Sequence, residues 1–223
     1  MPLASQPLID AVDNASSADD LLRAVRQLAA FSHPGVERQA LSCLVQVLGY
    51  NNPGAAVAAV DGLIAAGPAA VEPLLEGLDD HNYGARAWAV RALAGIGDVR
   101  GLELLEQALG QDIGPSVRRA AARGLGQLQL ESLTAEGAEA VRERCLVALE
   151  RSETDGEWVV RYAVSVALES LALSLPPGDG RRLRACAALG RLRHAHHEDA
   201  LVVRQRASLA LRRLDQAVSS LCR

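Results

Sequence analysis

Residues 83–98 read YGARAWAVRALAGIGD, and the spacing of the apolar side chains in this stretch decides the fold. Those side chains are Ala85, Ala89, Ala92, Leu93 and Ile96. The spacing of +4, +3, +1 and +3 places them on one face of an α-helix. Because the third residue is small, a neighbouring helix can approach closely there. The stretch therefore predicts a helix whose apolar face needs a partner.

The same spacing occurs in four other stretches. They are Val36-Ala40-Cys43-Leu44-Val47, Val117-Ala121-Gly124-Leu125-Leu128, Val160-Val164-Ala167-Leu168-Leu171 and Val203-Ala207-Ala210-Leu211-Leu214. The copies follow one another at offsets of 49, 32, 43 and 43 residues. These offsets scatter around the roughly 40 residues of a HEAT-type helix pair, and TPR and ankyrin repeats have tighter periods. The pattern predicts an all-α, HEAT-like α-solenoid, a right-handed superhelix of about five stacked antiparallel helix pairs plus one extra helix.

The domain organisation follows from the same pattern. Residues 1–17 are polar and weakly patterned, so we expect a disordered or frayed N-terminus, followed by a single HEAT-like repeat domain over 18–223. The expected pairs are 18–30 with 34–48, 69–78 with 83–96, 99–109 with 115–128, 136–151 with 157–172, and 181–193 with 199–215. The extra helix covers 53–66, with Asn52 placed to cap it and Pro53 at its first position.

Composition excludes several classes of protein. The net charge is −4, and all 23 basic residues are arginine, which does not favour a nucleic-acid partner. Residues 1–10 lack the basic and apolar regions of a signal peptide, and no apolar stretch approaches the roughly 20 residues that cross a bilayer. We therefore expect a cytoplasmic protein without a membrane span.

Neither the cysteines nor the histidines indicate a metal site. Cys43, Cys145, Cys186 and Cys222 include no CxxC pair, and the first three lie on helical apolar faces, as buried reduced thiols do. His194 to His197 fall in a short loop between helices, with no further ligands nearby in the sequence. We expect no bound metal.

Four copies carry an arginine directly after the first apolar position and an acid six residues before that arginine. The pairs are Asp80 with Arg86, Asp112 with Arg118, Asp155 with Arg161, and Glu198 with Arg204. An arginine early in a helix opposes the helix dipole, and a carboxylate in the preceding turn can compensate. We interpret the set as a structural ladder between stacked repeats, with a ligand-binding role as the alternative.

The positions that point away from the stack carry three of the six aromatic residues. With the apolar face inward, Tyr83, Trp158 and Tyr162 point outward. Arginines at comparable positions are Arg91, Arg119 and Arg123. In HEAT-type stacks the second helices line the concave wall, so these residues predict a groove for a flat, conjugated ligand with carboxylates. An interface with a partner protein is an equally good reading.

Three strings resemble the E/F-type phycobilin lyases of cyanobacteria, and especially the F-type subunit of the phycocyanin α-subunit lyase. They are YGARAWAVRALAGIGD at 83–98, SVRRAAARGLG at 116–126 and DGEWVVRYA at 155–163. The resemblance is good over residues 79–172 and loose at the ends. It implies a heterodimer with a larger E-type HEAT subunit that binds a linear tetrapyrrole and attaches it by a thioether to a cysteine of a phycobiliprotein subunit.

The resemblance also suggests roles for individual residues. The three outward aromatic residues would contact the bilin rings, and Arg91, Arg119 and Arg123 would take the propionates. Glu157, or second Asp112, would act as the catalytic carboxylate by hydrogen-bonding the pyrrole N–H groups and favouring the protonated bilin. A relative that isomerises the bilin carries an adjacent His–Cys pair, which this chain lacks, so we expect attachment without isomerisation.

Two other functions remain open on the sequence. One is a non-catalytic HEAT scaffold or chaperone for a phycobiliprotein, which would have the same repeats but no bilin transfer. The other is a HEAT-like nucleic-acid enzyme, such as an alkylpurine glycosylase, with Arg119 and Arg123 on phosphate. The acidic net charge argues against the second.

Overall fold

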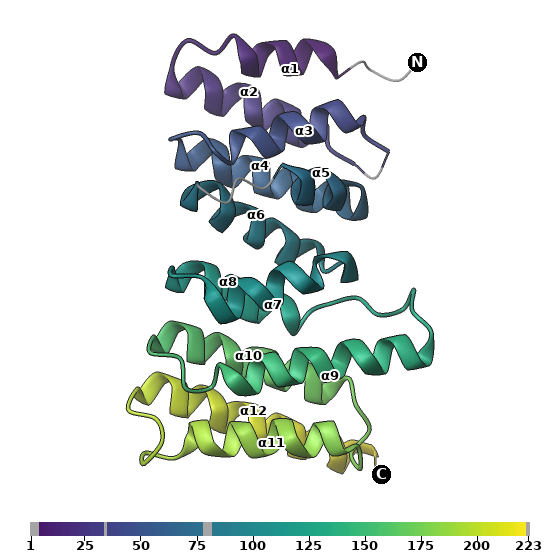
Figure 1. Ribbon diagram of the computed structural model, residues 1–223, viewed down its shortest axis with the longest axis vertical. Coiled ribbons are helices and arrows are strands. Elements are labelled where there is room, and N and C mark those ends of the chain that lie inside the picture. Colours follow the sequence, from purple (N-terminus) through teal and green to yellow (C-terminus); the bar gives the residue numbers. More distant parts are fainter. Residues whose placement is uncertain (1–4, 34, 78–81, 222–223) are drawn as a thin grey trace. The chain divides into compact units, whose positions relative to one another are not determined.

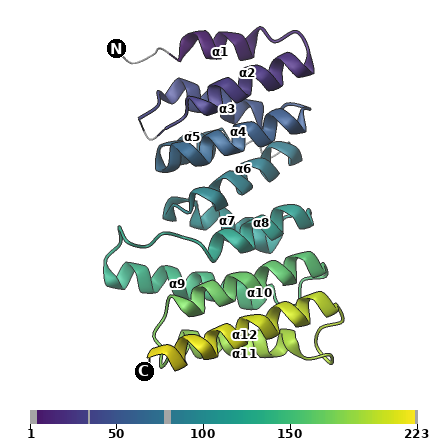
Figure 2. The ribbon, with the colours of Figure 1, turned by 180° about the vertical axis from the view of Figure 1, so that it is seen from behind.

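The computed structural model describes residues 5–33, 35–77 and 82–221, and every element in them is a helix (Figures 1 and 2). The chain forms two compact units, Met1–Gly101 and Leu102–Arg223. The single repeat domain expected over 18–223 stays a prediction.

The first unit contains α1 to α6 with two short 3-10 segments. Their bounds are α1 Gln6–Asp13, α2 Ala18–Ala30, α3 Arg38–Val47, α4 Pro53–Ala66, η1 Gly67–Ala70, α5 Val71–Glu76, α6 Tyr83–Ile96 and η2 Val99–Gly101. The expected cap of α4 is confirmed, because the Asn52 side chain accepts a hydrogen bond of 3.0 Å from the Ala55 N–H, and Pro53 is the first helical residue. The pattern at 83–96 is confirmed as α6, which Asn82 caps through the Ala85 N–H.

The pairing in the first unit differs from the expected one. Helix α1 packs on α2, α3 packs on α4, and α5 on α6, while α2, α4 and α6 stack in one layer. The segment 53–66 is therefore the second helix of a regular pair and no extra element. It carries its own copy of the apolar spacing, namely Ala55, Ala59, Gly62, Leu63 and Ala66, all of them buried. At Gly62 an added Cβ would lie 2.8 Å from Ala29 of α2, so only glycine allows this close approach.

The prediction of a frayed N-terminus was wrong for residues 6–13. Helix α1 packs against α2 and α3 and buries Ile9 and Val12. The buried Ser5 hydroxyl donates a hydrogen bond to the Glu37 carboxylate just before α3. The apolar pattern of α1 consists of only two buried residues three positions apart, which is too short to predict a helix from the sequence.

One segment is long and apolar enough to pass for a membrane span, contrary to the expectation. Pro53–Glu76 is 24 residues long with a mean hydropathy of 1.6 over its most apolar window, and 56% of that window is buried in the protein. Helix α4 packs against α2, α3 and α6. Burial in the core of the first unit accounts for this hydropathy.

The second unit contains three helix pairs among its described residues. They are α7 Leu102–Gln111 with α8 Pro115–Leu125, α9 Ala135–Arg151 with α10 Trp158–Leu173, and α11 Gly180–Arg193 with α12 Leu201–Leu221. Figures 1 and 2 show α7, α9 and α11 in one layer and α8, α10 and α12 in the other. The apolar faces meet between the layers, where Leu105, Leu125, Leu146 and Leu168 are fully buried. The stack presents the outer faces of α8, α10 and α12 together on one side.

Candidate functional site

Helix α10 presents two aromatic rings to solvent at its N-terminal end. Trp158 is 48% exposed and Tyr162 is 36% exposed, whereas Val160 and Val164 on the opposite face are fully buried. The two aromatic residues are one helical turn apart, so they lie on the same face. They form an exposed aromatic surface, suited to stacking against a flat ligand or a partner.

The third predicted aromatic residue, Tyr83, lies in the first unit. It is 42% exposed at the start of α6, and the Arg86 guanidinium lies 5.7 Å from its ring centroid. Because Tyr83 and the two rings of α10 belong to different units, a hollow shared by all three stays a prediction. Trp88 of the same helix is half-buried, and the Arg91 guanidinium lies 5.4 Å from its ring centroid.

Arg119 and Arg123 are exposed on α8, which packs beside α10 in the second unit. They are one turn apart and therefore form a short basic row on one face of α8. Such guanidinium groups can pair with the carboxylates of a ligand.

The arginines of the predicted ladder reach forward to the acid of the next repeat. Arg118 donates from Nε and Nη2 to the two carboxylate oxygens of Asp155, at 2.7 and 3.0 Å. Arg161 donates in the same way to Glu198, at 2.7 and 2.8 Å. These four side chains are mostly buried. The ion pairs therefore join consecutive helix pairs within the second unit.

The acid six residues upstream contributes its main chain to the same arginine. Arg118 Nη1 donates to the Asp112 carbonyl at 2.8 Å, Arg161 Nη1 to the Asp155 carbonyl at 2.7 Å, and Arg204 Nη1 to the Glu198 carbonyl at 2.9 Å. The charge of the upstream carboxylate also acts on its own arginine, because Asp112 helps to raise the pKa of Arg118 and Asp155 that of Arg161. Asp80 lies outside the described residues.

The pKa of Asp155 reflects this arrangement. Burial alone would raise the pKa of the carboxyl group, but hydrogen bonds from Arg118 and from the Glu157 N–H outweigh burial and lower it. The pKa values of Arg118 and Arg161 are raised by their bound carboxylates. All three groups are therefore held in their charged forms.

The two candidate catalytic carboxylates have different surroundings. Glu157 is exposed at the N-cap of α10, next to Trp158, and its side chain makes no capping hydrogen bond. Asp112 is half-buried, and its carboxylate accepts a hydrogen bond of 2.8 Å from the Gly114 N–H. Glu157 thus lies beside the aromatic surface, while Asp112 helps to shape the turn before α8.

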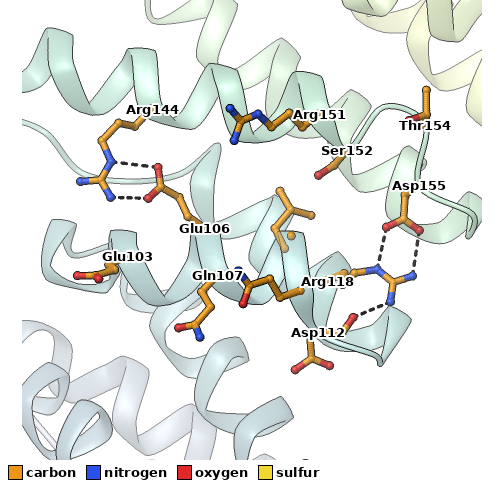
Figure 3. Close-up of a pocket in the computed structure, with 13 residues that line it drawn as sticks. Glu103, Glu106, Gln107, Asp112, Arg118, Arg144, Arg151, Ser152, Thr154 and Asp155 are labelled. Atoms are coloured by element: carbon orange, nitrogen blue, oxygen red, sulfur yellow. Dashed lines mark hydrogen bonds and ion pairs between the residues drawn. The ribbon is translucent and has the colours of Figure 1, made fainter.

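A cavity of about 980 Å³ lies between α7 and α9 (Figure 3). Its walls are mostly charged, and Figure 3 shows two ion pairs in them, Arg144 with Glu106 and Arg118 with Asp155. Among the residues predicted to bind the ligand or act on it, only Asp112 lines this cavity. The cavity lies by the first-helix layer, away from the faces that carry Trp158 and Arg119.

One charged cluster on the outer face of α10 and α12 was missed by the sequence reasoning. Glu169 of α10 pairs with Arg206 of α12, and Arg213 Nη1 lies 3.5 Å from Glu169 Oε1. A signal existed, because Glu169 follows Trp158 by eleven residues and Tyr162 by seven, which places all three on one face of α10.

The described cysteines are poor nucleophiles. Cys43 and Cys145 are 5% and 2% exposed, and burial raises their pKa values to about 11 and about 12. Burial also raises the pKa of the half-buried Cys186. Cys222 lies outside the described residues. No group of three His, Cys, Asp or Glu side chains that could hold a metal ion occurs within 5–33, 35–77 and 82–221.

Comparisons with known proteins place the chain in a family. The family model for HEAT repeats matches residues 51–126 and 71–169. The phycocyanin α phycocyanobilin lyase CpcF of Synechocystis sp. (strain ATCC 27184 / PCC 6803 / Kazusa) is 54% identical over 165 residues, which are 74% of this chain and 75% of that protein. The phycobilisome maturation protein of Synechococcus elongatus (strain ATCC 33912 / PCC 7942 / FACHB-805) is 45% identical over 215 residues, 96% of this chain and 100% of that protein.

Among solved structures, the complex of CpcE and CpcF of phycocyanin lyase from Nostoc sp. PCC7120 contains a similar chain. The TM-score is 0.70 with 37% sequence identity, and the match covers 78% of this chain and 99% of that one. The chain described here therefore belongs to the F-type bilin lyase subunits, a family of HEAT-repeat proteins.

Proposed function

We propose that this chain is one subunit of a heterodimeric phycobilin lyase of the cyanobacterial cytoplasm, which works with an E-type HEAT subunit. The enzyme attaches a linear tetrapyrrole by a thioether to a cysteine of a phycobiliprotein subunit. The observation that carries the proposal is the 54% identity to a protein named as the phycocyanin α phycocyanobilin lyase CpcF. The name of that relative supports phycocyanobilin as the bilin and the phycocyanin α subunit as the acceptor.

The exposed aromatic surface supplies the ring contacts in this proposal. Trp158 and Tyr162 stack on the conjugated rings, and Tyr83 adds a third face. Arg91, Arg119 and Arg123 take the propionates. The exposure of the three rings and of the three guanidinium-bearing side chains supports these roles.

The chemical step is the addition of the acceptor thiol across the exocyclic double bond of the bilin. The sulfur–carbon bond forms as the π bond breaks, and the thiol proton ends on the ring carbon, so no oxidant or leaving group is needed. Glu157, or less directly Asp112, hydrogen-bonds the pyrrole N–H groups and stabilises the protonated bilin, which makes the exocyclic carbon more electrophilic. Positioning of the bilin against the thiolate provides the rest of the catalysis.

We propose that attachment proceeds without isomerisation, so that only the exocyclic double bond is lost and the other double bonds of the bilin keep their positions. The four cysteines follow Ser42, Arg144, Ala185 and Leu221, so the chain has no adjacent His–Cys pair. The nucleophile belongs to the acceptor, since the described thiols are shielded and have raised pKa values.

Co-expression with an E-type subunit tests this function. The two chains are purified together, mixed with phycocyanobilin and the phycocyanin α subunit, and the acceptor is then denatured in acid. Visible colour that stays on the acceptor is the expected result. Colour that is lost on denaturation, or that forms equally well without this chain, would contradict the proposal.

A chaperone or scaffold for a phycobiliprotein is the second candidate. The name of the Synechococcus elongatus relative, a phycobilisome maturation protein, favours it. A chaperone would raise the yield of folded acceptor in step with its own concentration, but it would not speed attachment of the bilin to an acceptor that is already folded.

A further inference from the structure

Helix geometry places Glu169 on the side of α10 opposite the apolar pattern, and the residue is nevertheless only 5% exposed. The reason is its contact with α12, where Arg206, itself 9% exposed, donates from Nη2 to Glu169 Oε2. Taking two charges out of water is unfavourable unless their remaining polar atoms are also paired. The burial of this ion pair on the side of α10 opposite the apolar pattern therefore needs an explanation.

Two buried polar atoms of this pair have no hydrogen-bond partner, Glu169 Oε1 and Arg206 Nη1. Arg213 approaches Glu169 Oε1 only to 3.5 Å, and its side chain is 56% exposed. One negative and two positive charges give the cluster a net charge of +1. Arg213 is thus attracted to the pair through one nitrogen, and its side chain stays 56% exposed.

The cluster lies on the same side of α10 as the exposed aromatic surface. Successive residues turn by 100° around a helix, which brings Glu169 between Trp158 and Tyr162 in angle. Seven residues separate Tyr162 from Glu169, or about 10 Å along the helix axis. A linear tetrapyrrole stacked on the two rings is long enough to bring an acidic side group to Arg213.

We propose that Arg213 binds a propionate of the bilin whose rings lie on Trp158 and Tyr162, and that Glu169 and Arg206 position it. This inference rests on the proposed function and assigns one carboxylate subsite to α12. A planar guanidinium pairs with a carboxylate through two parallel hydrogen bonds. Arg213 has one contact of 3.5 Å to Glu169, so it can still form such a pair with a propionate.

The test compares a bilin acid with its ester. The chain, purified with an E-type subunit, is titrated with biliverdin and with biliverdin dimethyl ester, and binding is followed by visible absorbance. We expect the wild type to bind the acid at least about a hundredfold more tightly than the ester, because Arg213 and the arginines named above all pair with its carboxylates, and one such pair contributes about tenfold. In R213Q this preference falls about tenfold, with affinity for the ester unchanged.

R212Q is the matched control, because Arg212 is an exposed arginine on the same helix, turned by 100° from Arg213. It should keep the preference of the wild type. If R213Q keeps the full preference for the acid, or R212Q loses it equally, the assignment to Arg213 is overturned. Failure of the wild type to bind either compound would instead overturn the proposed function, and the subsite with it.

Discussion

Arg118 and Asp155 are 37 residues apart in the sequence and meet in a bidentate ion pair of 2.7 and 3.0 Å. Arg118 also holds the main chain of its own repeat through the Asp112 carbonyl. Asp155 in turn accepts from the Glu157 N–H at the start of α10. One ion pair thus fixes the turn before α8, the turn before α10 and the offset between two helix pairs.

The first prediction concerns stability. Asp155→Asn should lower the free energy of unfolding by about 2 kcal/mol, because it leaves a mostly buried guanidinium without its charged partner. Arg118→Ala should also lower the free energy of unfolding, and this loss should be larger than the loss of free energy of bilin binding. Urea denaturation followed by circular dichroism measures both. Glu131→Gln, at an exposed acid, is the control, and a D155N variant as stable as this control would remove the structural role of the pair.

The second prediction concerns pH. The pKa of Asp155 is lower in the folded chain than its value of about 3.9 in an unfolded one. The stability that this carboxylate contributes is therefore complete above about pH 4 and is lost as the pH falls through the folded pKa. Thermal melts between neutral and strongly acid pH should show a smaller loss below pH 4 in D155N than in the wild type. Parallel profiles would contradict the assignment.

The third prediction concerns the aromatic surface. Trp158→Ala should weaken bilin binding by about 2 kcal/mol, roughly thirtyfold, and abolish retention of the bilin on gel filtration. The far-ultraviolet circular dichroism should not change, since the ring is about half exposed. Leu183→Ala, which removes a side chain 60% exposed on α11, should bind bilin normally. Equal retention by W158A and the wild type would refute the stacking role.

The fourth prediction concerns the thiols. With pKa values of about 11 and about 12, Cys43 and Cys145 should react with a thiol reagent at pH 8 at least about a hundredfold more slowly than an exposed cysteine. Mass spectrometry of the labelled native chain measures this, with the unfolded chain as the control. The C43A/C145A variant should still support bilin transfer. A bilin adduct on either residue would show that the chain itself carries the chromophore.

The helices were predictable because each leaves a local pattern. The expected 157–172 is found as Trp158–Leu173, and all five residues of its apolar pattern are buried. The pairing was harder to predict, since Val36 to Val47 fits the pattern although α3 is a first helix, while α4 carries the pattern in small residues such as Ala55 and Gly62. Small side chains leave a weak hydrophobic signal even when helices approach very closely.

The contacts between repeats could not be predicted from one helix. Arginines and acids six residues apart were visible, but the partner of Arg118 is decided by the offset between helix pairs, which sequence periodicity does not contain. Glu169, Arg206 and Arg213 were missed for the same reason. The exposure of Trp158 and Tyr162 followed from helix geometry alone, because both lie opposite a continuous apolar face.

Catalytic turnover is the most direct test of the lyase assignment. The complex with an E-type subunit is supplied with phycocyanobilin and a large molar excess of folded phycocyanin α subunit, and acid-stable colour on the acceptor is followed with time. A lyase predicts that the coloured acceptor exceeds the amount of complex many times over, and that the W158A complex does not reach this level. Colour that stops at one acceptor per complex, or that develops at the same rate without the complex, would contradict the account.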